Sequence, residues 1–253
     1  GAGQGIGAAT ALRFAQEGAI LVLADQVSTG VEKLKDQLEQ EGVRTTTFLG
    51  DLSDWDTCHR LMEETIGTFG RIDVLVNNVG GSVRHQPFEE FTYTQIHQEL
   101  DRSFWPTIYC MRAVFPHMLL QGSGSIVNLG STAVEGILRG PYSAAKGAVM
   151  ALTTSLSKEV AAKGIRINCV APHATTVPNR VTPRNPDPEE ISPEDEERRN
   201  EWNKRWFGEG AYAGVDYIPM KRFGTPQEQA AVIAFLASDD ASFMTGQVLW
   251  VGS

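Results

Sequence analysis

Two side chains in the middle of the chain have the types and the spacing for proton transfer. Tyr142 and Lys146 stand four residues apart, so on a helix they lie on one face, one turn from each other. An ammonium at that distance favours the phenolate and lowers the pKa of a tyrosine from about 10 toward neutrality. Tyr142 could then act as a base near pH 7. Tyrosine and lysine also occur at this spacing on ordinary helices, so the interpretation depends on the rest of the chain.

A second group of residues, at the start of the chain, has the pattern of a phosphate-binding loop. A predicted helix begins at Gly5 and includes Gly7, and Gly1 lies just before it. Glycines allow a tight turn and a close approach of the backbone to phosphate, and the helix N-terminus supplies N–H groups. Asp25 ends the next predicted strand, where a carboxylate accepts hydrogen bonds from a ribose 2′-hydroxyl and repels a 2′-phosphate. Because Gln26 rather than an arginine follows it, the pattern predicts NAD in preference to NADP.

The elements that must position these residues alternate along the chain. Apolar runs typical of strands buried in a parallel sheet occur at 19–24, 45–49, 72–76, 125–129, 165–170 and 247–251. Helices are predicted between them over 5–17, 29–41, 53–69, 94–120, 142–163 and 226–237. This alternation builds right-handed βαβ units. The predicted fold class is therefore α/β, one doubly wound parallel sheet of the Rossmann type over residues 1–253.

Three local signals refine the helix ends. Ser53 is the predicted N-cap of the third helix. Pro106 is expected to bend the helix over 94–120 or to delay its start. Thr225 and Glu228, with a proline between them, predict a capping box at the start of the last helix.

Two features depart from the alternation. A phosphate-binding loop needs a strand before it, so a strand of roughly 5–8 residues is expected ahead of Gly1, and the chain is interpreted as lacking both tips. Residues 177–217 form a long proline-rich and acidic insertion before the last helix. Such insertions are more often lids or binding elements than idle loops. Residues 177–217 are therefore predicted to form a substrate lid, with a solvated acidic surface as the alternative.

The composition limits the class of protein and its partners. The chain has 253 residues and a net charge of −9, which argues against a nucleic-acid-binding surface. Its three cysteines, Cys58, Cys110 and Cys169, have no CxxC spacing, which predicts a reducing, cytoplasmic setting and no metal site. No apolar run approaches the ~20 residues that span a bilayer. The expected partner is a small-molecule substrate, without nucleic acid or membrane.

Six motifs in fixed order resemble the short-chain dehydrogenase/reductase family. They are the glycine loop at 1–7, Asp51 before Leu52, the run Asn77-Asn78-Val79-Gly80, the run Asn128-Leu129-Gly130-Ser131, Tyr142 with Lys146, and Pro172. The resemblance implies a dehydrogenase in which Tyr142 takes a hydroxyl proton while a hydride leaves the same carbon for a nicotinamide. It also implies that Ser131 holds the substrate oxygen and that Lys146 hydrogen-bonds the nicotinamide ribose. The implied catalytic set is Ser131, Tyr142 and Lys146.

The resemblance further implies which residues contact the cofactor. Asp51 would contact the adenine amino group, Asn78 would border the cofactor, and Pro172 would begin the loop on the nicotinamide side. The expected cofactor-binding residues are Gly1, Gln4, Gly5, Ile6, Gly7, Asp25, Asp51, Leu52, Asn78, Tyr142, Lys146, Pro172 and Thr175. Members of the family are usually tetrameric, so a homotetramer is expected.

The chain departs from the family pattern at three places. Ser103 stands where the family has a catalytic asparagine, which leaves the usual proton relay in doubt. Ser131 and Tyr142 are separated by 142 − 131 = 11 positions, a little fewer than in the family, which implies a tighter connecting loop. His173 follows Pro172 where glycine is common, and it either fills space or contacts nicotinamide or substrate.

Within the family, the stretches 77–81, 102–107, 141–147 and 220–224 look closest to cis-dihydrodiol dehydrogenases of aromatic acid breakdown. That group oxidises a cyclohexadiene carboxylate diol, made from benzoate or p-cumate, to a catechol. A carboxylated substrate needs an arginine or lysine in the pocket, and the candidate substrate residues are Arg84, Arg139, His173 and Arg180. Two alternatives stay open: another alcohol dehydrogenase or 3-oxoacyl reductase of the family, and a non-catalytic dinucleotide-sensing protein.

Overall fold

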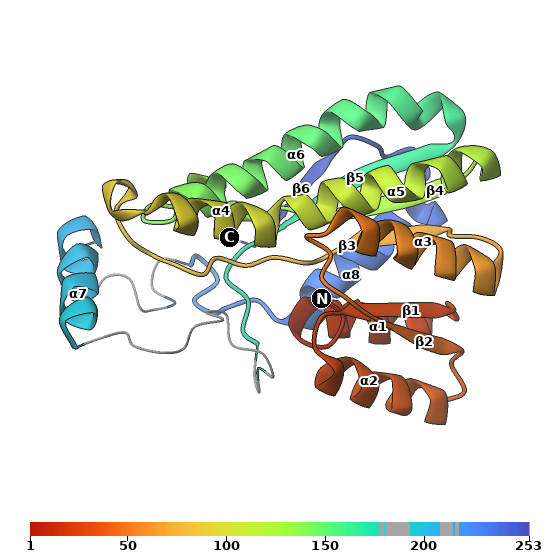
Figure 1. Cartoon of the computed structure of the whole chain (residues 1–253), viewed down its shortest axis with the longest axis horizontal. Helices are drawn as coiled ribbons and strands as arrows, with labels where there is room; N and C mark the ends of the chain where they lie inside the picture. The colour runs from red at the N-terminus through yellow and green to blue at the C-terminus, as the bar shows by residue number, and fades with distance from the viewer. Residues whose placement is uncertain (178–179, 181–192, 208–214, 216–217, 253) are drawn as a thin grey trace.

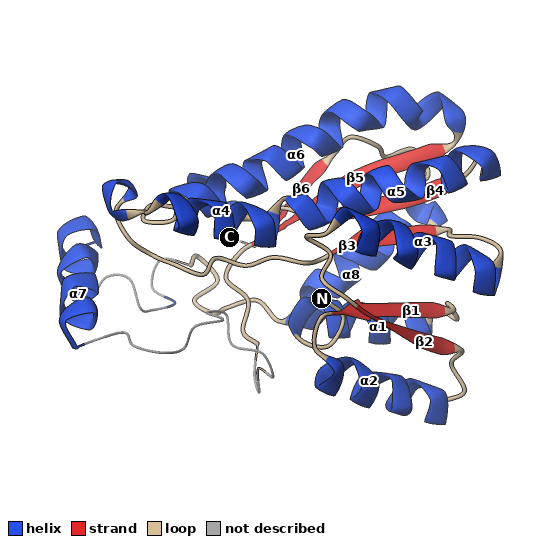
Figure 2. Ribbon diagram, in the orientation of Figure 1, coloured by secondary structure: helices blue, strands red, loops and turns tan. Residues whose placement is uncertain are grey.

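Parallel strands lie between two layers of helices. The computed structural model describes residues 1–177, 180, 193–207, 215 and 218–252. Helices α5 (Trp105–Gln121) and α6 (Gly140–Val160) lie in front of the strands in Figure 1, and α8 (Pro226–Ala237) lies behind them. All three helices contact β4 (Gly124–Leu129), so this strand is covered on both faces. The helices and strands alternate as the sequence predicts (Figure 2).

The strands form two parallel sheets. One pairs β1 (Leu21–Asp25) with β2 (Thr45–Leu49). The other has the order β3 (Val74–Asn77), β4, β5 (Ile165–Pro172), β6 (Val248–Val251), with every pair parallel. This arrangement confirms the predicted doubly wound α/β fold of the Rossmann type. The strands form two parallel sheets where one was predicted, because no described strand pairs with both β1 and β3.

Gly1 lies between the two sheets. Its nitrogen donates a hydrogen bond to the carbonyl oxygen of Ala24 at 2.6 Å, and its own carbonyl oxygen accepts one from Asn78 Nδ2 at 2.8 Å. The start of the glycine loop is therefore tied to the ends of β1 and β3. The strand expected ahead of Gly1 stays a prediction.

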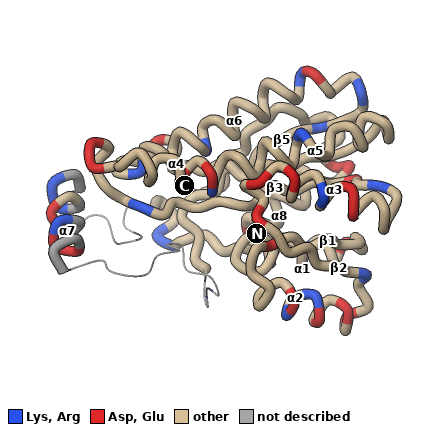
Figure 3. Tube along the Cα trace, in the orientation of Figure 1, with Lys and Arg blue, Asp and Glu red and all other residues tan. Residues whose placement is uncertain are grey.

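Bounds close to the predicted ones are found for α1 (Gly5–Gln16), α2 (Ser28–Gln40) and α3 (Trp55–Phe69). Helix α4 (Tyr93–Ser103) is the first part of the helix predicted over 94–120. Helix α7 (Pro193–Phe207) was not predicted and lies within the segment 177–217. Charged residues lie mainly on these helices and on the loops, while the strands carry few (Figure 3). Few charges are expected in strands such as β4, which has helices on both faces.

Three helix ends correct or confirm the local signals. The N-cap of α3 is Asp54, whose Oδ2 accepts from the Thr57 N–H at 2.7 Å, and the prediction of Ser53 was wrong. The helix predicted over 94–120 is two helices that meet at Phe104, and Pro106 stands in the first turn of α5. A proline fits there because the first-turn N–H groups have no helical partner. The capping box at Thr225 is confirmed.

The predicted lid at 177–217 falls mostly outside the described residues, which in that range comprise 177, 180, 193–207 and 215. Helix α7 belongs to this segment and lies apart from the sheets in Figure 1. The lid therefore stays a prediction.

Candidate active site

A cleft with a volume of about 1190 Å³ opens where the strands end. Open α/β sheets bind their ligands at this edge, outside the carboxyl ends of the strands. The last residue of a strand, or one directly after it, lines the cleft at each of the six strands: Asp25, Gly50, Asn78, Gly130, Pro172 and Gly252. The fold therefore brings residues that are far apart in the sequence to one site.

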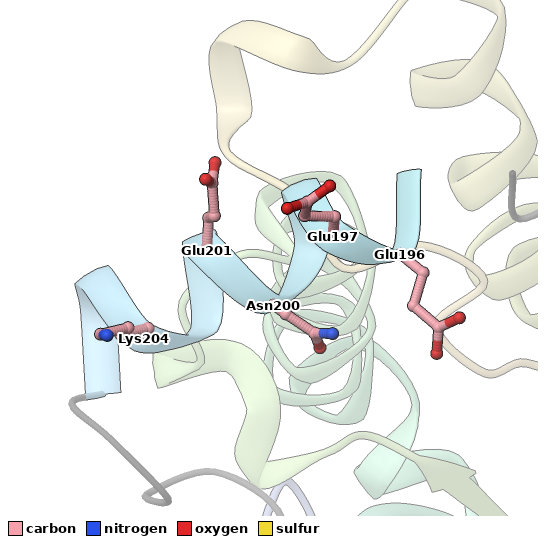
Figure 4. A pocket seen from close by; sticks show the side chains of 5 residues that line it. All are labelled: Glu196, Glu197, Asn200, Glu201 and Lys204. Atoms are coloured by element: carbon pink, nitrogen blue, oxygen red, sulfur yellow. The ribbon is translucent and has the colours of Figure 1, made fainter. Parts of the chain in front are cut away.

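A smaller hollow of about 410 Å³ lies on the surface of α7. It is lined by Glu196, Glu197, Asn200, Glu201 and Lys204. In Figure 4, Glu197 and Glu201 project from one side of α7 and Glu196 and Asn200 from the other. Polar groups that do not converge cannot fix a ligand. The cleft at the strand ends is the better candidate for the functional site.

Tyr142 and Lys146 occupy the first two turns of α6 and both line the cleft. Tyr142 is 9% exposed and Lys146 is 3% exposed. Lys146 Nζ donates a hydrogen bond to the carbonyl oxygen of Leu129 at 2.8 Å, at the end of β4. Burial lowers the pKa of Lys146 to about 8, against the opposing effect of the Cys169 thiol. The predicted helix pair is thus a buried pair that faces the cleft.

Ser131 is held beside this helix by the turn that follows it. Its Oγ accepts a hydrogen bond from the Ala133 N–H at 3.1 Å, which fixes the start of the 3-10 turn Thr132–Glu135. Ser143 Oγ in the first turn of α6 donates back to the Ala133 carbonyl oxygen at 2.6 Å. The short connection between Ser131 and Tyr142 is therefore closed by hydrogen bonds, and both side chains line one cleft.

Three buried side chains join the strands to α6 beneath this site. Asn77 Nδ2 donates to Asn128 Oδ1 at 2.8 Å, and Asn128 Nδ2 donates to Thr153 Oγ1 at 2.9 Å. Asn77 ends β3, Asn128 lies in β4, and Thr153 lies on α6. The hydrogen bonds fix the position of α6 relative to the two strands.

The glycine loop has the geometry that a dinucleotide requires. A Cβ at Gly7 would stand 1.9 Å from the Gly1 carbonyl oxygen, so only glycine lets α1 approach this closely. Gly5 has a φ of +58°, and no side chain among the described residues caps the N-terminus of α1. Asp25 accepts hydrogen bonds from the Gly3 N–H at 2.9 Å and the Val27 N–H at 3.1 Å. The loop, the helix N-terminus and the carboxylate thus fit the phosphates and ribose of a dinucleotide.

The structure brings nearly all of the expected cofactor-binding residues to the cleft. Gly1, Gln4, Gly5, Ile6, Asp25, Asp51, Leu52, Asn78, Tyr142, Lys146, Pro172 and Thr175 line it. Gly7 does not line it and serves the close packing of α1 instead.

The candidate substrate residues divide into two groups. Arg139, His173 and Arg180 line the cleft, whereas Arg84 does not and its Nη1 donates to Gln98 Oε1 at 2.8 Å. Two lining residues that sequence reasoning missed are Arg102 and His85. Arg102 carried a signal, because it directly precedes the position of the expected asparagine, whereas His85 carried none.

Two kinds of site are absent from the described residues. Among them, no group of three or more histidine, cysteine, aspartate and glutamate side chains could hold a metal ion. In the same part of the chain, no helix has the length and apolarity to cross a membrane.

Comparison with known proteins identifies the class. Residues 1–187 match the family model described as short chain dehydrogenase, and residues 203–253 match one described as Enoyl-(Acyl carrier protein) reductase. The chain belongs to the short-chain dehydrogenase/reductase family. It is an oxidoreductase of that family and uses a nicotinamide cofactor.

Particular relatives share its whole length. The chain is 42% identical to a 1,6-dihydroxycyclohexa-2,4-diene-1-carboxylate dehydrogenase of Acinetobacter baylyi, over all of this chain and 92% of the relative. It is 41% identical to a Pseudomonas putida protein of the same name, over 98% of this chain and 88% of the relative. Among solved structures, NAD⁺-bound xylitol dehydrogenase matches with a TM-score of 0.83 and 28% identity, over 99% of this chain and 95% of the other.

Proposed function

We propose that the enzyme oxidises a cis-dihydrodiol of an aromatic carboxylate, of the benzoate or p-cumate type, to a catechol with NAD. The observation that carries the proposal is one cleft that joins Asp25, the pair Tyr142 and Lys146, and several arginines. The full-length likeness to two dihydroxycyclohexadiene carboxylate dehydrogenases supports this substrate class. Oxidation of one hydroxyl gives a ketone. This ketone becomes an aromatic ring by tautomerising or by releasing its carboxylate as CO2, and the stability of the aromatic product draws the reaction forward.

The proposed mechanism assigns the proton to Tyr142. As a phenolate it takes the proton from the substrate hydroxyl, and Ser131 Oγ donates a hydrogen bond to the same oxygen. Working near pH 7 requires a tyrosine pKa about 3 units below its usual value, which is about 4 kcal/mol of differential stabilisation. The ammonium of Lys146, one turn away and 3% exposed, contributes to it because charges interact more strongly out of water. The bound nicotinamide supplies the acceptor for the hydride.

The preference for NAD rests on Asp25. Its carboxylate lines the cleft next to Gln26 and is oriented by two backbone N–H groups. A fixed negative charge there accepts from the two ribose hydroxyls and repels a 2′-phosphate. Comparing kcat/KM with NAD and NADP tests this assignment, and a preference for NADP would contradict it.

The carboxylate of the substrate is assigned to the arginines that line the cleft: Arg102, Arg139 and Arg180. Arginine binds a carboxylate with two parallel hydrogen bonds, which fixes orientation as well as charge. Measuring NAD reduction with cis-dihydrodiols that carry or lack the ring carboxylate tests the substrate class. Equal KM values for the two kinds of diol, and for an alanine variant of each arginine, would refute the assignment.

The same assay separates the proposal from another activity in the family. A 3-oxoacyl reductase would turn over a 3-oxoacyl thioester faster than a dihydrodiol carboxylate, and we expect the reverse. Tyr142→Phe should abolish turnover while NAD still binds. Residual turnover in that variant would argue against Tyr142 as the base.

Two further features are part of the proposal. Val177 and Arg180 line the cleft, which supports a lid formed by residues 177–217. A homotetramer is proposed as well, because Phe235 on α8 and Phe243 before the last strand are large apolar side chains that are exposed and do not line the cleft. Light scattering on the purified protein measures the assembly, and a monomer would contradict this part.

A further inference from the structure

Helix α4 turns two buried polar side chains toward the loop that follows β3. Glu99 is 1% exposed and Ser103 is fully buried, and their spacing of four residues places them on one face of the helix. Glu99 Oε1 accepts hydrogen bonds from the N–H groups of Val83 and Arg84, both at 2.9 Å. Ser103 Oγ accepts one from the Gly81 N–H at 3.3 Å. Three backbone donors of the loop 80–84 are therefore held by α4.

This loop is a wall of the cleft and lies against the lysine. Gly80, Gly81 and Ser82 line the cleft, and a Cβ at Gly80 would stand 2.8 Å from Lys146 Nζ. Gly80 and Gly81 have φ values of +142° and +145°, which glycine adopts readily and other residues rarely do. Two adjacent glycines also give the unfixed loop many conformations. Its position over Lys146 therefore depends on contacts from outside the loop.

The contact between Glu99 and the loop 80–84 requires a buried carboxylate, which is unfavourable for folding. Burial raises the pKa of Glu99, against the hydrogen bonds from Arg84 and Val83 and the charges of Arg84 and Arg102. Its second oxygen, Oε2, is buried without a hydrogen-bond partner among the described residues. Burying a carboxylate that is only half hydrogen-bonded opposes folding. A residue retained at such a cost is expected to serve the site that it supports.

We propose that Glu99 is a positioning residue of the catalytic centre, whose carboxylate holds the loop 80–84 over Lys146 and keeps water from the lysine ammonium. The inference rests on the proposed function of Tyr142 and Lys146. Glu99 provides the main hold because it accepts two short hydrogen bonds, whereas Ser103 accepts one longer bond.

The pKa of Lys146 indicates whether the loop 80–84 lies over its ammonium. Three groups surround or neighbour its ammonium: the Leu129 carbonyl oxygen from β4, the Cys169 thiol from β5, and Tyr142 one turn away on α6. Burial is the main cause that lowers the pKa of Lys146 from 10.5 to about 8. If the loop is released, water reaches the ammonium and the pKa of Lys146 rises toward 10.5.

The test is a titration of Lys146 in the full-length protein. The protein is labelled with [ε-¹³C]lysine, the Lys146 signal is assigned by its absence in Lys146→Met, and its shift is followed by NMR over pH. Glu99→Gln keeps an oxygen that accepts both N–H groups, whereas Glu99→Leu keeps none. Gln121→Leu is the matched control, because Gln121 Oε1 accepts from the Ile72 N–H at 2.9 Å and Gln121 does not line the cleft.

We expect Glu99→Leu to raise the pKa of Lys146 by about one unit or more, while Glu99→Gln and Gln121→Leu leave it near the value in the unmodified protein. A folded Glu99→Leu variant with an unchanged pKa of Lys146 would overturn the inference. If Glu99→Leu does not fold, Ser103→Ala is measured instead, and we expect a smaller rise in the pKa of Lys146. An unchanged pKa of Lys146 in Ser103→Ala would refute the idea that α4 holds the loop. Turnover by Tyr142→Phe, measured separately in a protein that keeps Glu99, tests the proposed function by a readout other than this titration.

Discussion

Replacing Lys146 by methionine should change how stability depends on pH. The pKa of Lys146 is about 8 in the folded protein, against 10.5 for an ordinary lysine, a difference of 10.5 − 8 = 2.5 units. At 1.36 kcal/mol per unit this is about 3 kcal/mol, and the side chain is 3% exposed, so solvent screening is small. Between pH 8 and 10.5 the unfolded chain binds more protons at this residue than the folded one. The free energy of unfolding therefore rises with pH across that window.

Below pH 8 both states carry the proton and the penalty of burying the ammonium is fully present. Methionine has no charge to bury, so the stability of Lys146→Met should lack this rise. The hydrogen bond from Lys146 to the Leu129 carbonyl oxygen contributes little to the pH dependence of the free energy of unfolding, because a neutral amine also donates to that oxygen.

Urea unfolding followed by tryptophan fluorescence measures the difference between the two proteins. We expect the stability of the unmodified protein relative to Lys146→Met to increase by about 3 kcal/mol from about pH 7.5 to pH 10.5. Titrating groups that do not interact with Lys146 contribute equally to both proteins and cancel. Parallel stability curves for the two proteins would refute the buried, charged lysine on which the argument depends.

Three further changes test other parts of the site. Gly80→Ala places a methyl group 2.8 Å from Lys146 Nζ, on a residue with a φ of +142°. The resulting strain of about 1–3 kcal/mol should lower kcat/KM by tenfold or more. Steady-state kinetics on the folded variant measure this fall. Asn128→Ala leaves the buried Asn77 Nδ2 without its acceptor and should lower the free energy of unfolding by about 1–3 kcal/mol in urea; an unchanged midpoint would contradict the network. Asp25→Ser removes a charged acceptor of the ribose hydroxyls and should reduce kcat/KM with NAD by roughly ten- to a hundredfold, with less effect on NADP; equal losses with both cofactors would count against its proposed role.

The sequence was sufficient for the fold and for most of the residues that line the cleft. Strand ends follow from apolar runs and helix caps, which are local patterns, and parallel strands then place all of their carboxyl ends at one edge. That rule is enough to bring Asp25, Asn78 and Ser131 together. It does not depend on how any one side chain packs.

What could not be predicted depends on contacts across the chain. The break at Phe104 was missed because Pro106 is compatible with both a bent helix and the first turn of a new one. Glu99 was missed because it stands in a polar stretch, where a glutamate is usually solvated. Its partners are N–H groups of Val83 and Arg84, at least fifteen positions earlier. No periodicity in the sequence marks such a contact.

The burial of Lys146 sets stability and catalysis against each other. At pH 7 a lysine with a pKa of about 8 is still about nine-tenths protonated, so its charge is available to stabilise a phenolate at Tyr142. The same charge opposes folding, and the opposition disappears only above pH 8, where the charge that helps Tyr142 is lost as well. A more stable enzyme could be obtained at this position only by giving up the ammonium, a trade that is common at catalytic sites. The alkaline side of the activity profile should therefore fall in the pH range in which the protein becomes more stable.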